Sequence, residues 1–140
     1  MSRHIHTDWA AIAFVYHPNS DNTVLVKDEK YKSSLWKLPG GKYKTRDSGP
    51  EDTVLRELKE ETGLIGVQTE LRAQEDRNNH IMYLFQVTVL DYDNMLDIGD
   101  EGEIVSQFPR KTVTDGMVDF FPGHMNLLRA AGIITTPSYS

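Results

Sequence analysis

The sequence predicts an α/β fold, an α/β/α sandwich with a central mixed β-sheet. Residues 9–16 are apolar on both alternating faces, which is typical of a central strand that is covered on both sides. Other strand patterns are interleaved with two helix patterns, one beginning near residue 50 and one near residue 122. Strands interleaved with helices favour helical layers packed on a sheet.

The stretch that follows the first strand is predicted to hold two short strands and a polar loop. Residues 23–27 form a β-branched run, and residues 35–38 form a second short run that ends at Pro39-Gly40-Gly41. The loop over residues 41–49 carries three cationic side chains, those of Lys42, Lys44 and Arg46. We therefore expect this loop to bring positive charge close to the glycine pair.

A helix is predicted to begin at Pro50, because proline suits the first helical position, where its missing N–H would have no partner. Ser48 or Gly49 is the expected N-cap, and the spacing Ser48-x-x-Glu51 matches a capping box. Gly63 marks the expected end, since glycine is the usual residue after a helix C-terminus.

The second half of the chain changes to a period of two and then returns to helix. The predicted elements are a strand over residues 65–71, a turn over 76–79, a strand over 81–90, an acidic loop over 91–102, a strand over 103–108 and a helix over 122–131. Residues 135–140 are expected to form a flexible tail.

Length and composition exclude several classes of protein. The 140 residues predict a single domain over residues 1–140, and the lack of cysteine excludes a disulfide framework or a thiolate metal site. The net charge of -6 argues against a nucleic-acid polymer as partner, because such binding needs a basic face. The longest apolar run, residues 9–16, is too short to span a bilayer, and no small-residue cleavage site follows it. We expect a cytoplasmic protein with no membrane partner.

The most informative segment is Arg56-Glu57-Leu58-Lys59-Glu60-Glu61-Thr62-Gly63-Leu64. On a helix, Glu57, Glu60 and Glu61 fall within roughly 100° of one another, so their carboxylates share one face. At about 6 Å and an effective dielectric near 20, each ordered pair would repel by roughly 3 kcal/mol. A multivalent cation would remove this repulsion, and oxygen ligands alone suit Mg²⁺ or Mn²⁺. Read without its context, the segment is also compatible with a solvated helical face.

The residues just before the polar loop point to phosphate. Gly40 and Gly41 would let the backbone approach a phosphate group closely. Lys37 and Lys42 flank this pair and could bind phosphate oxygens, although basic residues in polar loops are often only solvated. Trp36 is a candidate for stacking on a base.

Together these residues resemble the Nudix hydrolase family, whose signature is Gly-x5-Glu-x7-Arg-Glu-U-x-Glu-Glu-x-Gly-U, where U is aliphatic. Residues 56–64 fit the whole second half, and Trp36-Lys37-Leu38-Pro39-Gly40-Gly41 is similar to the segment that precedes this box in family members. The resemblance implies the family's sandwich fold. It also implies metal-dependent hydrolysis of a nucleoside diphosphate linked to another group.

The first half of the box departs from the family pattern. Counting forward from Gly41, the family's glutamate position is Asp47; counting back from Arg56, it is Ser48, so the loop has one extra residue and no glutamate. Asp47 is a possible substitute. The resemblance implies that Arg56 anchors this loop to the helix through a salt bridge.

The resemblance also implies a set of roles for the acidic residues. Glu57, Glu60 and Glu61 would hold Mg²⁺ or Mn²⁺, and a further glutamate would take the proton from the attacking water. Glu103 is the first candidate for this base, because Glu103-Ile104-x-x-x-Phe108-Pro109 is similar to the family's segment there; Glu101 is the second.

Substrate and assembly are less well determined by the sequence. We expect a small nucleotide, such as a nucleoside triphosphate, and the family is compatible with a homodimer. Gly123-His124 lack the acidic or amide groups that family members acting on oxidised purine triphosphates carry near this place. The alternative function is a non-catalytic nucleotide sensor on the same fold, for which we would expect a decayed glutamate triplet.

Overall fold

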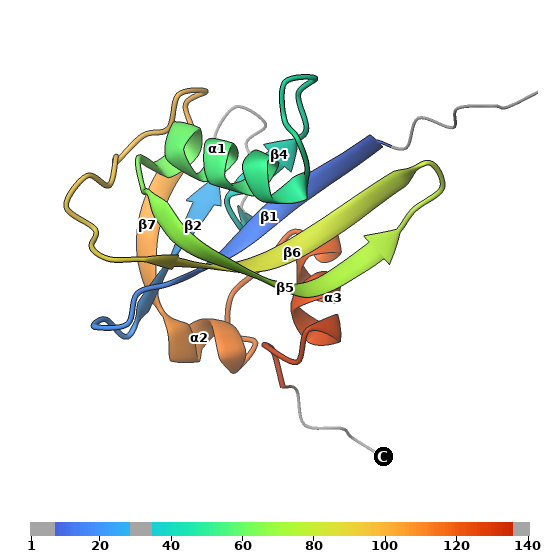
Figure 1. Ribbon diagram of the computed structural model, residues 1–140. Coiled ribbons are helices and arrows are strands. Elements are labelled where there is room, and N and C mark those ends of the chain that lie inside the picture. The colour runs from blue at the N-terminus through green and yellow to red at the C-terminus, as the bar shows by residue number, and fades with distance from the viewer. Residues whose placement is uncertain (1–7, 29–34, 136–140) are drawn as a thin grey trace, which may run out of the picture.

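The computed structural model describes residues 8–28 and 35–135, and in these ranges it contains two β-sheets and three helices (Figure 1). Most of the expected tail, residues 136–140, lies outside the described ranges. The elements in chain order are β1 (Asp8–Tyr16), β2 (Asn22–Lys27), β3 (Trp36–Lys37), β4 (Gly40–Lys42), α1 (Pro50–Thr62), β5 (Gly66–Asp76), β6 (His80–Val89), β7 (Ile104–Pro109), α2 (Arg110–Thr114) and α3 (Pro122–Ala130).

The larger sheet is mixed, as the sequence predicts. Its strand order is β4-β1-β6-β5, with β1 parallel to β6 and antiparallel to β4, and β5 antiparallel to β6. A second sheet, of order β3-β2-β7, is antiparallel throughout. The sequence did not predict this second sheet, because a strand pattern does not reveal which strand is its partner.

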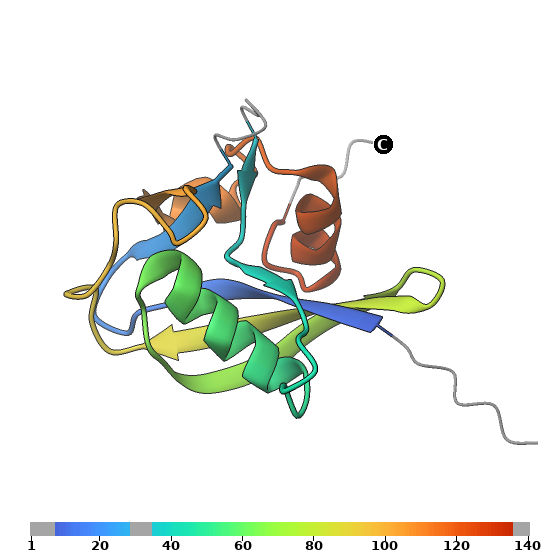
Figure 2. The ribbon, with the colours of Figure 1, turned by 90° about the horizontal axis from the view of Figure 1, so that it is seen from above.

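Strand β1 separates two hydrophobic clusters, which confirms the prediction that it is covered on both sides. Ala11, Ala13 and Val15 face the cluster formed with α1, whose Val54 and Leu58 are fully buried. The opposite face of β1 packs with α2 and α3 in the second cluster, to which it contributes Ala10, Ile12 and Phe14. Two views show α1 on one side of the large sheet and α2 and α3 on the other (Figures 1 and 2).

Helix α1 begins and ends where the sequence predicts, but the predicted capping box does not form. Gly49 is the N-cap, without a side-chain cap, and Gly63 ends the helix with a left-handed φ of 79°. The backbone N–H and hydroxyl of Ser48 both donate to the Asp52 carboxylate instead. Ser48 lies one residue before the N-cap, so its partner is on the next turn and not at Glu51.

Three other segments differ from expectation. β4 lies where the polar loop was predicted to begin, and the five-residue helix α2 was missed because so short and polar a segment has no clear apolar period. The apolar positions expected on one face of residues 65–71 lie at the edge of the large sheet, where Ile65, Val67 and Leu71 are about half exposed. No helix in the described part of the chain is both long enough and apolar enough to cross a membrane.

Candidate active site

A cavity of about 250 Å³ lies between the two sheets, at the C-terminal end of α1. Six of the residues that the sequence singled out as first candidates line it, together with Glu101, the second candidate for the base. These six are Lys37, Gly40, Gly41, Lys42, Glu61 and Glu103. Segments far apart in the sequence therefore meet at one place, which combines acidic side chains with the glycine pair.

Glu61 lies at the wall of this cavity and is fixed by the backbone. Its Oε1 accepts a hydrogen bond from the N–H of Gly40 at 2.6 Å. A side chain at Gly40 is excluded, because its Cβ would lie 2.2 Å from the carbonyl oxygen of Ala11. Burial raises the pKa of Glu61 to about 9, and the negative charges of Glu57 and Glu103 add to the rise. The site therefore disfavours a bare negative charge on Glu61.

Glu57 occupies the space that a side chain at position 41 would fill. A Cβ on Gly41 would lie 2.7 Å from the carboxyl carbon of Glu57. Burial raises the pKa of Glu57, although the neighbouring Arg56 guanidinium opposes the change. The glycine pair therefore has two different functions: Gly40 lets β4 approach β1, and Gly41 makes room for a carboxylate of α1.

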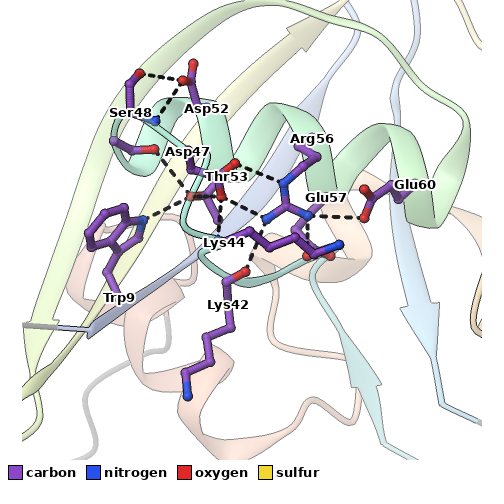
Figure 3. Close-up of polar contacts among 11 residues, drawn as sticks. Trp9, Lys42, Lys44, Asp47, Ser48, Asp52, Thr53, Arg56, Glu57 and Glu60 are labelled. Carbon is purple, nitrogen blue, oxygen red and sulfur yellow. Dashed lines mark hydrogen bonds and ion pairs between the residues drawn. The ribbon is translucent and has the colours of Figure 1, made fainter.

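Arg56 joins the loop before α1 to the helix through Asp47 (Figure 3). Its Nε and Nη2 donate to the two Asp47 oxygens at 3.0 and 2.9 Å, a bidentate ion pair. Asp47 also accepts hydrogen bonds from the N–H of Lys44 and the hydroxyl of Thr53. These contacts hold the pKa of Asp47 well below its usual range. Asp47, reached by counting forward from Gly41, thus sits where a loop-to-helix anchor is needed, whereas Ser48 does not contact Arg56.

The third carboxylate of the triplet, Glu60, is turned toward the same arginine. Arg56 Nη1 donates to Glu57 Oε1 at 3.0 Å and to Glu60 Oε2 at 3.2 Å (Figure 3). In the described part of the chain, no three acidic or histidine side chains form a ready-made cation cage. The three glutamates share one helix face, but their oxygens point to Arg56 and to the backbone of Gly40.

The loop before β7 closes over the end of α1 and carries Glu103. Glu103 is only 7% exposed, and its Oε1 accepts the N–H of Glu101 at 3.0 Å. Gly99 makes the closure possible, because a Cβ there would lie 2.5 Å from the carbonyl oxygen of Glu61. Glu101 itself is exposed. Of the two candidates for the base, Glu103 is the one buried beside Glu61.

Among the predicted site residues, Arg56, Glu57 and Glu60 do not line the cavity, and neither does Trp36. The Trp36 ring packs edge-to-face on Phe108, with centroids 4.7 Å apart, and the Lys27 ammonium lies over it. Lys37 does line the cavity, and its Nζ lies 5.0 Å from the centre of the Phe121 ring. Lys42 reaches the cavity from an exposed position.

Sequence reasoning missed His124, which lines the cavity from the first turn of α3. Its Nδ1 accepts the N–H of Leu38 at 3.0 Å. Burial lowers the pKa of His124 to about 4, with help from the positive charges of Lys37 and Arg77. The imidazole is therefore neutral near pH 7 and carries its proton on Nε2. The family resemblance marked Gly123-His124 only as lacking acidic or amide groups, and a lone histidine gives no sequence signal of its contact with Leu38.

Comparison with known proteins supports the family. A family profile described as NUDIX domain matches residues 6–122. No curated protein sequence matches the chain.

Solved structures show the same fold. A MutT structure from work on Aliivibrio salmonicida and Vibrio cholerae has a TM-score of 0.72 at 17% identity, covering 89% of this chain and 96% of its own. The Escherichia coli ORF135 protein has a TM-score of 0.64 at 20% identity, with 88% and 86% covered. A protein described as a nudix hydrolase family member from Chromobacterium violaceum has a TM-score of 0.62 at 20% identity, with 87% and 74% covered. Because the profile match spans most of the sequence, the chain belongs to the Nudix hydrolase family, whose enzymes act on pyrophosphate bonds.

Proposed function

We propose that this protein is a metal-dependent pyrophosphohydrolase that cleaves a small nucleotide, a nucleoside diphosphate linked to another group. One observation carries the proposal: the carboxylates of Glu61 and Glu103 line one cavity with the backbone of Gly40 and Gly41. Acidic groups beside a glycine pair suit a phosphate substrate only if a cation offsets their charge.

The residues present fit a divalent cation. Glu57, Glu60 and Glu61 offer only oxygen donors from one helix face, the ligand type that Mg²⁺ and Mn²⁺ prefer. When bound, such a cation would neutralise charge on the phosphate oxygens and make a water molecule more acidic. Two of these carboxylates, those of Glu57 and Glu60, form ion pairs with Arg56. We propose that Glu57 and Glu60 exchange this contact for the cation, while Asp47 keeps Arg56 in place.

The other cavity residues supply the remaining steps. Glu103 accepts the proton of the attacking water, and the water oxygen forms a bond to phosphorus. The bond between that phosphorus and the bridging oxygen breaks, and its electron pair leaves with the second phosphate. Lys37 and Lys42 add positive charge beside the glycine pair, where phosphate oxygens would lie.

The small cavity supports a small substrate. Its volume of about 250 Å³ leaves room for a pyrophosphate and part of its substituent. The net charge of -6 supports free nucleotides over nucleic-acid polymers as substrates. Nucleoside triphosphates, nucleotide sugars and dinucleoside polyphosphates all contain the required bond.

The test is a screen of these three substrate classes with Mg²⁺, scored for released phosphate, pyrophosphate or nucleoside monophosphate. The test variants are Glu60→Gln and Glu61→Gln. Their matched control is Glu70→Gln, which changes an exposed glutamate on β5. We expect turnover of at least one class, lost in the first two variants and kept in the third. Binding without release in the wild type would instead indicate the nucleotide sensor.

A further inference from the structure

A second cavity, of about 780 Å³, lies at the other end of β1 from the glutamate cavity. Ala10 and Ile12 of β1 border the glutamate cavity, whereas Phe14 and Tyr16 border this one, together with α2 and the residues that follow α3. Among the described residues that line the two cavities, none is shared. The second cavity therefore has a chemistry of its own.

Its dominant charge is Arg110, which the surrounding residues hold in place. The guanidinium carbon lies 4.8 Å from the centre of the Tyr16 ring, and Nη1 donates to the carbonyl oxygen of His17 at 3.3 Å. Its side chain is only 25% exposed, while the Asp21 carboxylate, 3.9 Å away, is fully exposed. A long contact with a solvated carboxylate offsets little of the charge. Arg110 thus provides a preorganised positive centre inside a hollow.

The cavity is also lined by an acidic residue, the solvent-exposed Asp21, and by further groups that can donate. Gln86 accepts a hydrogen bond from Arg72 at 2.8 Å through its Oε1, which leaves the amide nitrogen to donate. Lys111 adds a second cation, although it pairs with Asp115 at the surface. A ligand for these groups must offer acceptors and negative charge.

The remaining walls are apolar. Phe14, Pro109 and Ile133 line the cavity beside the Tyr16 ring. A planar ring could cover this surface while its charged substituent reached Arg110. We propose that the cavity is a second ligand site, for a small organic anion in which a planar ring carries a phosphate or carboxylate group.

The site can be tested by two-dimensional ¹H–¹⁵N NMR of the full chain in Mg²⁺ buffer. The protein is titrated separately with AMP, benzoate and inorganic phosphate. We expect AMP or benzoate to shift the signals of Gly132, Thr114 and the Gln86 side-chain amide. The dissociation constant from these shifts should be at least tenfold lower than that of inorganic phosphate. Tighter AMP binding would identify a phosphate ligand, and tighter benzoate binding a carboxylate ligand.

Two variants and one control make the test specific. Arg110→Gln removes the positive centre, and Thr114→Phe fills the cavity while keeping Arg110. Each should weaken binding at least tenfold, whereas Arg129→Gln, an exposed arginine on α3, should leave it unchanged. If Arg110→Gln does not fold, as its own NMR spectrum would show, Thr114→Phe decides. The proposal is overturned if no probe shifts these signals at 10 mM, if inorganic phosphate binds as tightly as the ring compounds, or if the folded variants bind like the wild type.

Discussion

The two ends of β1 lead to cavities of opposite chemistry. At one end, Glu61 and Glu103 present oxygen acceptors, and at the other Arg110 and Gln86 present donors. Both cavities lie on the same side of β1, which contributes Ala10 and Ile12 at one end and Phe14 and Tyr16 at the other, none of them charged. The comparison teaches that β1 carries no charge into either cavity, while the neighbouring elements determine whether an anionic ligand would need a cation to bind there.

The largest effect is expected when an acidic side chain of the glutamate cavity is replaced. Glu61→Gln should abolish turnover, because it removes an expected cation ligand. In metal-free protein the same change should raise the melting temperature at pH 8. Burial raises the pKa of Glu61 to about 9, so at pH 8 folding of the wild type costs the free energy of protonating this carboxyl, and glutamine avoids that cost. Enzyme assays and thermal melts with and without Mg²⁺ test both effects. The assignment fails if the variant retains near-normal activity.

Removing the proposed base should have the next largest effect. Glu103→Gln should lower kcat by about 10²- to 10⁴-fold, the usual contribution of a general base. The fold should persist, because glutamine can still accept the N–H of Glu101. Glu101→Gln is the matched control, and a larger loss there than at position 103 would reverse the choice between them.

The pH dependence of stability tests whether the buried His124 in the glutamate cavity is neutral. His124 has a lowered pKa of about 4, so between pH 6.5 and pH 4 the unfolded state binds more protons than the folded state. Stability should therefore fall as pH decreases through this range, by up to about 3 kcal/mol. His124→Asn can keep an acceptor for Leu38 without titrating there. Urea unfolding at several pH values should show a flatter profile for this variant; identical profiles would contradict the assignment.

A smaller loss is expected at the anchor of the loop. Asp47→Ala leaves Arg56, which is 14% exposed, without its bidentate partner. We expect a loss of about 2 kcal/mol in the free energy of unfolding, less than for a fully buried pair because Arg56 keeps its contacts to Glu57 and Glu60. Denaturant unfolding measures this, with Asp52→Ala as a neighbouring comparison. A loss no greater than that of the comparison variant would show that the ion pair does not hold the loop.

The smallest effect should come from an ion pair beside the second cavity. Lys111 and Asp115 are 2.9 Å apart, but their side chains are 84% and 47% exposed. Asp115→Asn should therefore change the free energy of unfolding by less than about 0.5 kcal/mol. The same unfolding assay compares it with Asp47→Ala. If both variants lost a similar free energy of unfolding, the exposed pair and the Asp47–Arg56 pair would contribute equally to stability, which would contradict this prediction.

Local patterns explain what the sequence could predict. The bounds of α1 follow from Pro50 and Gly63, and the shared face of the three glutamates follows from helical spacing. The burial of β1 on both sides follows from its unbroken apolar run. Each of these features depends on neighbours within a few positions.

Features that depend on distant partners could not be predicted. The position of His124 in the glutamate cavity depends on its contact with Leu38, far earlier in the chain. The exposure of Val67 and Leu71 depends on β5 being an edge strand, which periodicity does not reveal. The edge-to-face contact of Trp36 with Phe108 joins β3 and β7 of the second sheet, and its partner lies far along the chain.

The parallel pairing of β1 with β6 has a consequence for the order of folding. Asp8 pairs with His80, so the chain must close a long loop, which includes α1, before this pair forms. Helix α1 can nucleate locally, but the glutamate cavity also needs residues of β1 and of β6, which lie at the two ends of that loop. Non-local pairings of this kind slow folding. We therefore expect the helix carrying the glutamates to form early and the binding cavity to be among the last parts of the molecule to be completed.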